Sequence, residues 1–207
     1  GLIIDEKNIE EEIKIENNNQ IKGLKSQIED AYSLRCSPQI VGPIYESLQF
    51  IENIIENELN SSSDNPLVIP EENEVFHNGH FHGQYISMVM DYLSISMTVL
   101  TNLADRRIDR FMDQSNSNGL PPFLCSIDPG LRLGLMGGQF MATSVTAENR
   151  SNCHPVSIQT LTSTGDFQDI VSFGLVAGRK AKDIIKNSSY VVAYELLCAC
   201  QAVDIRG

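Results

Sequence analysis

The chain has 207 residues, 42% of them hydrophobic, which suits one domain, or a large part of one, with a sizeable core. A formal net charge of −12 and a pI near 4.7 argue against nucleic acid or an anionic membrane surface as a partner. The five cysteines are odd in number, scattered and without a CxxC pair. They indicate neither a disulfide framework nor structural zinc, and with no export leader in view we expect a cytoplasmic protein.

The first segment, residues 1–25, is rich in Glu, Lys, Asn and Ile and lacks strong apolar periodicity. We interpret it as a mobile arm or the cut edge of something larger, and residues 26–207 as a helical portion. Apolar positions at helical spacing then predict an amphipathic helix from Ile44 to Leu59, with Pro43 in its first turn. The prolines and glycine in residues 66–79 predict a turn, two short extended pieces and a loop.

The segment from Phe76 to Asp113 carries the longest helical pattern in the chain, and we expect it to form the central helix. Apolar residues recur at spacings of three and four from Ile86 to Leu100, and others fill the remaining faces, so we expect burial nearly all round. We do not expect a membrane span, because polar residues interrupt the roughly 20 apolar residues that it needs. The interrupting residues are Asp91, Ser94, Ser96, Thr98, Thr101 and Asn102.

The remaining segments complete an all-α pattern. Residues 114–134 hold several glycines and prolines and predict a long structured loop. Helical patterns follow at Met136 to Asn149, Phe167 to Lys186 and Ser188 to Ile205, the last with a stripe from Val192 to Val203. Strand alternation never extends beyond a few residues, so we predict an all-α fold.

Some residues admit alternative chemistry. His77, His80 and His82 could converge on a metal, but no carboxylate or cysteine spacing completes a ligand set, so we predict none. Cys153 and His154 could be imagined as a nucleophile and its base, yet adjacent side chains rarely point at each other. The charged run 105–110 is typical of a solvated or subunit-facing helix end.

Eight motifs in order resemble the histidine, phenylalanine and tyrosine ammonia-lyases and the related aromatic 2,3-aminomutases. The motifs are AYSLRCSPQ at 31–39, SSSDNPL at 61–67, HFHG at 80–83, DRRIDR at 105–110, GLPPFL at 119–124, AENRSNCHPVS at 147–157, FQDIVSFG at 167–174 and YELLCACQAVDIR at 194–206. The resemblance implies an incomplete long-helix bundle of the ammonia-lyase, fumarase/aspartase-like type. It also implies a homo-oligomer, a dimer or a tetramer, whose active sites take residues from several subunits.

The resemblance also implies a prosthetic group that this chain does not form. These enzymes build methylidene-imidazolone (MIO) from an Ala-Ser-Gly tripeptide in their N-terminal half, and no Ala-Ser-Gly occurs in this sequence. The chain therefore looks like the middle-to-C-terminal part of the enzyme. We expect the fragment alone to be inactive.

Family positions assign roles to residues near the start of the helical portion. Arg35 matches the residue that receives the substrate carboxylate, and a planar guanidinium offers two parallel donors for that purpose. Tyr32, three residues earlier, is expected to form a hydrogen bond near MIO. Glu29 stands where glutamine is usual, so its carboxylate must be protonated, displaced or given another partner.

Later family positions concern the surroundings of MIO and the choice of substrate. His80 stands where asparagine is usual in the family. Phe81 keeps the family's aromatic residue, which packs against MIO and the substrate; the alternative for Phe81 is a simple core phenylalanine. Gln168 replaces the glutamate of histidine ammonia-lyases, which favours an aryl substrate over histidine. The resemblance implies elimination of ammonia to give an arylacrylate. The alternatives are an aromatic 2,3-aminomutase, which re-adds the amine, and a catalytically dead helical scaffold, which the departures at Glu29 and His80 would suit.

Overall fold

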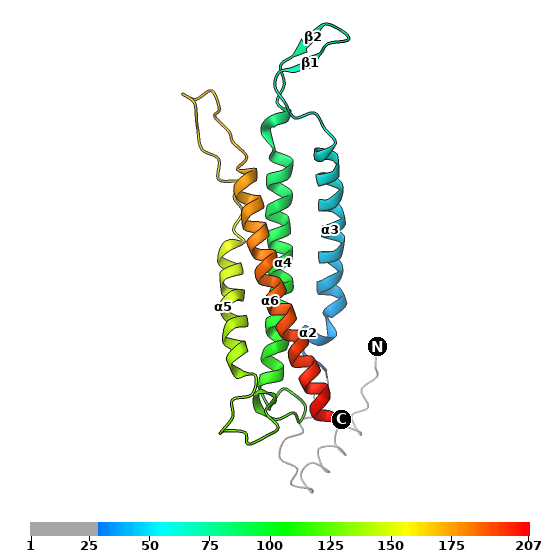
Figure 1. The fold of residues 1–207 in the computed structure, drawn as a ribbon, viewed down its shortest axis with the longest axis vertical. Coiled ribbons are helices and arrows are strands. Elements are labelled where there is room, and N and C mark those ends of the chain that lie inside the picture. Colours follow the sequence, from blue (N-terminus) through cyan, green and yellow to red (C-terminus); the bar gives the residue numbers. More distant parts are fainter. Residues whose placement is uncertain (1–28) are drawn as a thin grey trace.

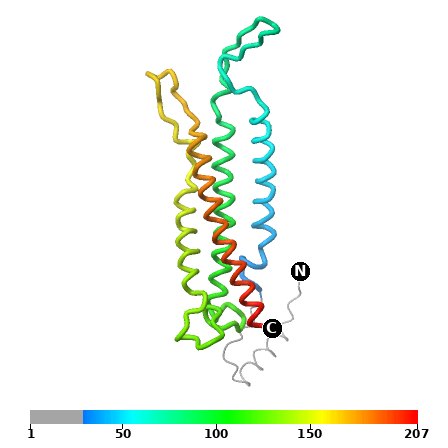
Figure 2. The backbone as a smooth tube through the Cα atoms, in the orientation of Figure 1, coloured from blue at the N-terminus to red at the C-terminus, as the bar shows by residue number. Residues whose placement is uncertain are grey.

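The computed structural model describes residues 29–207, which form an elongated bundle of helices (Figure 1). The predicted arm at 1–25 and residues 26–28 lie outside this described part. The α-helices are α2 (Tyr32–Arg35), α3 (Ser37–Leu59), α4 (Gln84–Met112), α5 (Met136–Asn152) and α6 (Gly174–Arg206). Helices α3 and α5 run in one direction and α4 and α6 in the other (Figure 2). The all-α class is confirmed.

Helix α4 is central, since it contacts α3, α5 and α6. The prediction that it is buried nearly all round is wrong for the single chain, because Met88, Tyr92, Ile95 and Val99 form an exposed stripe. Between Ser87 and Thr101, most of the buried residues of α4 are small hydroxyl residues, which allow the neighbouring helices to approach closely. Their hydroxyls donate to carbonyls one turn earlier, at distances of 2.7–2.9 Å, and so cost little to bury. These residues are Ser94, Ser96, Thr98 and Thr101.

Among the described residues, one segment is long and apolar enough to cross a membrane by length and composition alone. It is His80–Met112, and 44% of its most apolar window is buried inside the bundle. The buried part includes Asp91 and Thr101, whose polar atoms have protein partners. These features are those of the core helix of a bundle.

The largest differences from the predicted helix boundaries are in α3 and α6, and α5 extends three residues further than predicted, to Asn152. Helix α3 begins at Ser37, with Pro38 in its first turn, and Pro43 lies inside it. The predicted helices at 167–186 and 188–205 are instead one helix, α6, that begins only at Gly174, because Phe173 has a left-handed backbone with φ of 55°. Ser188 does not interrupt this helix, since its hydroxyl lies 2.7 Å from that of Thr101 and bonds to the Ile184 carbonyl.

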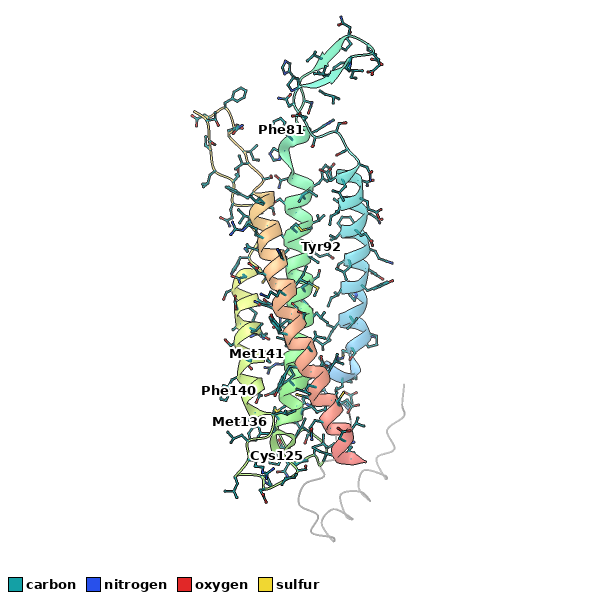
Figure 3. The ribbon with its side chains drawn as sticks, viewed as in Figure 1. Phe81, Tyr92, Cys125, Met136, Phe140 and Met141 are labelled. Atoms are coloured by element: carbon teal, nitrogen blue, oxygen red, sulfur yellow. The ribbon has the colours of Figure 1, made fainter. Side chains whose placement is uncertain are left out.

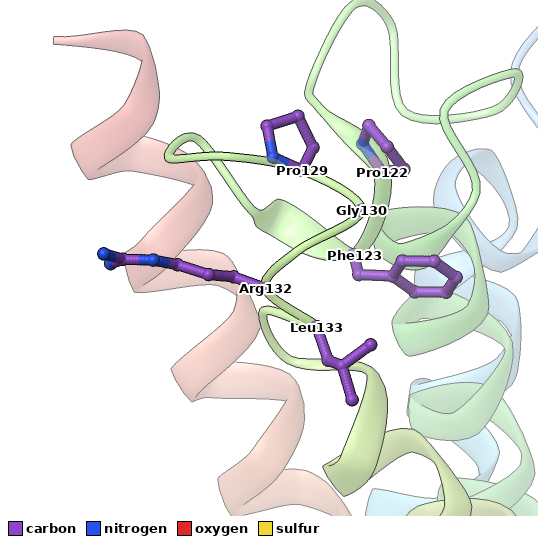
Figure 4. Close-up of a pocket in the computed structure, with 6 residues that line it drawn as sticks. All are labelled: Pro122, Phe123, Pro129, Gly130, Arg132 and Leu133. Carbon is purple, nitrogen blue, oxygen red and sulfur yellow. The ribbon is translucent and has the colours of Figure 1, made fainter.

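The connections between helices complete the bundle. The two predicted extended pieces are confirmed as an antiparallel hairpin of β1 (Leu67–Ile69) and β2 (Glu74–Phe76), followed by the 3-10 helix η1 (His80–His82). At the opposite end, the predicted loop at 114–134 contains η2 (Pro122–Leu124). This loop lines a small pocket with Phe123, Arg132 and Leu133 among its walls (Figure 4).

Candidate active site

One group of predicted site residues lies on and beside α2, next to the start of α3. The guanidinium of Arg35 lies over the Tyr32 ring, with its carbon 4.8 Å from the ring centroid. Its Nη2 atom lies 2.7 Å from the Glu29 carboxylate. Glu29 thus has another partner, one of the three outcomes expected for its carboxylate. We call Glu29, Tyr32 and Arg35 the Arg35 group.

The Arg35 group is open to solvent in the single chain. Tyr32 is 68% exposed, and the side chains of Arg35 and Glu29 are 38% and 62% exposed. An exposed ion pair of this kind contributes about 0–1 kcal/mol, so it can be exchanged for another carboxylate at small cost. The geometry therefore allows the Arg35 guanidinium to bind an exchangeable carboxylate beside the face of the Tyr32 ring.

The second group lies where the chain enters α4 (Figure 3). Phe81, in η1, exposes 55% of its surface, so it is not a simple core phenylalanine within the single chain. His80 is held by its backbone N–H, which donates to Asn78, and its Nδ1 lies 3.2 Å from the Ser62 carbonyl oxygen. Among the described residues, no three His, Cys, Asp or Glu side chains gather as a metal site would require.

Gln168 lies in the exposed loop of residues 153–173, which is at the same end of the bundle as the hairpin β1–β2 (Figure 1). Phe81 lies at this end too (Figure 3). Its side-chain oxygen accepts the Thr164 hydroxyl at 3.0 Å, and its backbone pairs with that of Ser163. We call His80, Phe81 and Gln168 the Phe81 group.

The loop that carries Gln168 is fastened to α4 at both of its ends. At its start, the buried carboxylate of Asp91 accepts the backbone N–H groups of Val156 and Ser157 at 2.9 and 2.7 Å. At its end, Ser87 donates to the Ser172 carbonyl at 2.5 Å, and the Ser172 hydroxyl donates to the His82 carbonyl at 2.6 Å. These bonds determine where the loop leaves and rejoins the bundle.

The two groups lie at opposite ends of the bundle. Arg35 precedes α3 and Phe81 follows it, and the 23 residues of α3 span about 35 Å at 1.5 Å per residue. One chain therefore does not bring Arg35 and Phe81 to the same substrate.

Sequence reasoning missed two residues that hold these groups. Asp91 appeared only as a polar interruption of the central helix, and Arg107 only as part of a charged run expected to be solvated or subunit-facing. The run is not simply solvated: Asp105 is 2% exposed and pairs with Arg106, and Arg107 binds three protein groups. The sequence offered one signal for Asp91: a carboxylate within an apolar helical stretch is expected to be buried with hydrogen-bond partners.

The model of the aromatic amino acid lyase family matches residues 8–207 of this chain. The tyrosine ammonia-lyase of Cupriavidus metallidurans is 46% identical over 87% of this chain and 34% of its own length, and the histidine ammonia-lyase of Natranaerobius thermophilus is 44% identical over 87% and 35%. The phenylalanine aminomutase structure from Pantoea agglomerans is 61% identical, with a TM-score of 0.85 over 100% of this chain and 40% of that one.

The fold and the site thus define an all-α protein with the helical bundle of the ammonia-lyases. The chain belongs to the aromatic amino acid lyase family, as the resemblance predicted. It spans about a third of the length of the curated relatives that it matches.

Proposed function

We propose that this chain is the middle-to-C-terminal part of an MIO-dependent enzyme that eliminates ammonia from an aromatic L-amino acid. The observation that carries the proposal is the Arg35 guanidinium, which lies on the Tyr32 ring and holds an exchangeable carboxylate, that of Glu29. Arg35 binds the substrate α-carboxylate through two parallel N–H donors when Glu29 releases it.

The described residues fit a prosthetic group supplied from outside this segment. Tyr32 and Phe81 are both more than half exposed although they are aromatic, so the Tyr32 hydroxyl and the Phe81 ring are open to a neighbour. MIO supplies the electrophile that makes the substrate amine a better leaving group. Tyr32 donates a hydrogen bond near that group, and Phe81 packs against the substrate ring.

Gln168 supports an aryl substrate over histidine. Its side chain is a neutral amide, whereas histidine ammonia-lyases carry a glutamate there, so the site is less anionic. Several relatives named for tyrosine or phenylalanine support the same preference, although relatives named for histidine are nearly as similar.

We also propose a homo-oligomer, a dimer or a tetramer with closed symmetry. Besides the exposed stripe on α4, other helices expose apolar side chains, among them Val41 and Tyr45 of α3 and Leu196 and Val203 of α6. Copies that cover these faces in opposite orientations would place the Arg35 group of one chain beside the Phe81 group of the next. Light scattering at micromolar concentration tests this, and a folded monomer would contradict it.

A 2,3-aminomutase is the second candidate, favoured by the 61% identity to the Pantoea agglomerans phenylalanine aminomutase over the whole chain. The full-length protein should be incubated with phenylalanine, tyrosine and histidine, and arylacrylate, ammonia and β-amino acid should be measured. Arylacrylate and ammonia indicate a lyase, and β-amino acid indicates a mutase. Turnover of none of the three would support a catalytically dead scaffold, and preference for histidine would contradict the aryl assignment.

A further inference from the structure

Helix α2 needs support from outside itself. It has four residues, none of them buried, and a single isolated helical turn is unfavourable in water. It nevertheless carries Tyr32 and Arg35 in a defined arrangement, with the guanidinium over the ring. Its contacts outside the adjoining α3 are with α4.

Arg107 on α4 provides the support. Its Nε donates to the Ser33 carbonyl at 2.8 Å, and its Nη2 donates to the Ser37 hydroxyl at 2.6 Å. The Ser37 hydroxyl in turn donates to the Leu34 carbonyl at 2.6 Å. Arg107 thus holds, directly and through Ser37, the two residues that immediately precede Arg35.

Arg107 is itself held by an acidic partner on a third helix. Its Nη1 donates to Glu195 of α6 at 3.0 Å, and the two side chains are only 25% and 17% exposed. The guanidinium therefore directs its three nitrogens at α2, α3 and α6. A lysine has a single nitrogen and cannot span these three acceptors in the same plane.

We infer that Arg107 is a positioning residue that sets the orientation of Arg35 toward the substrate carboxylate. This inference rests on the proposed function, because it takes Arg35 as the carboxylate-binding residue. Arg107 acts through the backbone of Ser33 and Leu34 and does not touch the substrate. Its loss should weaken recognition of the carboxylate in particular, and leave recognition of the aryl group unchanged.

The test uses the full-length protein and two competitive inhibitors, cinnamate and its neutral amide, cinnamamide. The ratio of their inhibition constants measures preference for a carboxylate. Arg107→Met should lower this preference about tenfold, the effect of about 1.4 kcal/mol. Arg106→Met is the matched control: it removes the ion pair with Asp105 and so lowers the melting temperature, but it does not touch α2 and should keep the preference.

Further variants separate positioning from folding. Arg107→Lys, which keeps a cation beside Glu195, and Ser37→Ala, which removes one link to α2, should each lower the preference by a smaller factor. If Arg107→Met does not fold, the preferences of Arg107→Lys and Ser37→Ala test the positioning role instead. In an Arg35→Met background, Arg107→Met should cause no further loss of preference, because both act on the same contact.

The outcomes distinguish the inference from the proposed function. If Arg35→Met leaves the preference unchanged, the assignment of Arg35 to the carboxylate fails. If Arg35→Met abolishes the preference while Arg107→Met and Arg107→Lys retain it, the positioning role of Arg107 fails and the proposed function stands.

Discussion

The carboxylate of Asp91 accepts the backbone N–H of Ser157 at 2.7 Å, which joins the first third of α4 to the base of the loop that carries Gln168. The same oxygen accepts the N–H of Val156, and Asp91 is 5% exposed. Because buried N–H groups are costly to leave unpaired, this one oxygen determines where the loop begins.

Replacing Asp91 should loosen the loop before it unfolds the bundle. Asp91→Ala leaves two N–H groups without their acceptor, a cost of about 1–3 kcal/mol for each that stays buried. We expect faster amide exchange in residues 153–173 and a lower kcat. Asp91→Asn can keep an acceptor oxygen in place and should have a smaller effect. Unchanged exchange in Asp91→Ala would contradict the anchoring role.

Removing the carboxylate at position 29 should make Arg35 easier for a substrate to reach. Glu29→Gln abolishes the ion pair, which at this exposure is worth about 0–1 kcal/mol, so KM should fall by up to about fivefold. Asp30→Asn, a change of the same charge at the next position, is the control. A KM that rises in Glu29→Gln would mean that Glu29 orients Arg35 and does not compete for it.

Two neighbouring glycines in α5 should respond differently to alanine. A Cβ at Gly138 would lie 2.1 Å from the Tyr194 ring, whereas a Cβ at Gly137 meets nothing within 4 Å. Overpacking typically costs about 1–3 kcal/mol, so Gly138→Ala should lower the free energy of unfolding. Gly137→Ala should not lower it, because alanine favours a helix by up to about 1 kcal/mol. Denaturant titration of both variants measures the difference, and equal stability would mean that the ring moves aside.

Stability should fall at alkaline pH because of one pair of residues in α6. Burial raises the pKa of the Tyr194 hydroxyl from 10.0 to about 12, and burial raises the pKa of the Cys198 thiol from 9.0 to about 11. At a pH between the ordinary pKa and the raised pKa of each group, the folded chain keeps a proton that the unfolded chain has lost. The stabilisation is therefore complete below about pH 9 and is lost as pH rises through 11 and 12.

Tyr194→Phe tests this pH dependence. It should flatten the fall in unfolding free energy above pH 10, the ordinary pKa of tyrosine, while it lowers stability at neutral pH by about 1 kcal/mol through loss of the hydrogen bond to the Leu135 carbonyl. Tyr190→Phe, on the same helix but half exposed, is the control. An equal slope in both variants would show that Tyr194 does not cause the fall.

Helical periodicity located most of the bundle because spacings of three and four mark the buried face of an amphipathic helix. It expected α4 to be buried nearly all round, whereas the stripe with Ile95 and Val99 is exposed. It also treated hydroxyl residues as polar interruptions, whereas Thr98 and Thr101 are buried and donate their hydroxyls along the helix. It also divided α6 at Asn187 and Ser188, which resemble a loop in sequence. Ser188 is instead buried, with Asn149 and Thr101 as partners, and only tertiary packing provides these.

The site residues came from family motifs, and their positions in space could be predicted only in part. A helix from Ile44 to Leu59 was predicted between Arg35 and Phe81, but their separation along the bundle became evident only in the structure, where α3 has 23 residues. The roles of Asp91 and Arg107 could not be predicted, because their partners come from distant segments, with Ser157 in one case and Ser33 and Glu195 in the other.

Both anchors belong to one uninterrupted helix, and this restricts how the protein can change length. Asp91 and Arg107 are 16 positions apart on α4, which corresponds to about 24 Å along the axis. An inserted residue between them would rotate one anchor by about 100° relative to the other and shift it by about 1.5 Å. The hairpin β1–β2 and the loop at 153–173 can gain or lose residues at their tips without moving either anchor. An insertion beside Val99 should instead change the orientation of Asp91 relative to Arg107, and with it that of the two ends of the molecule.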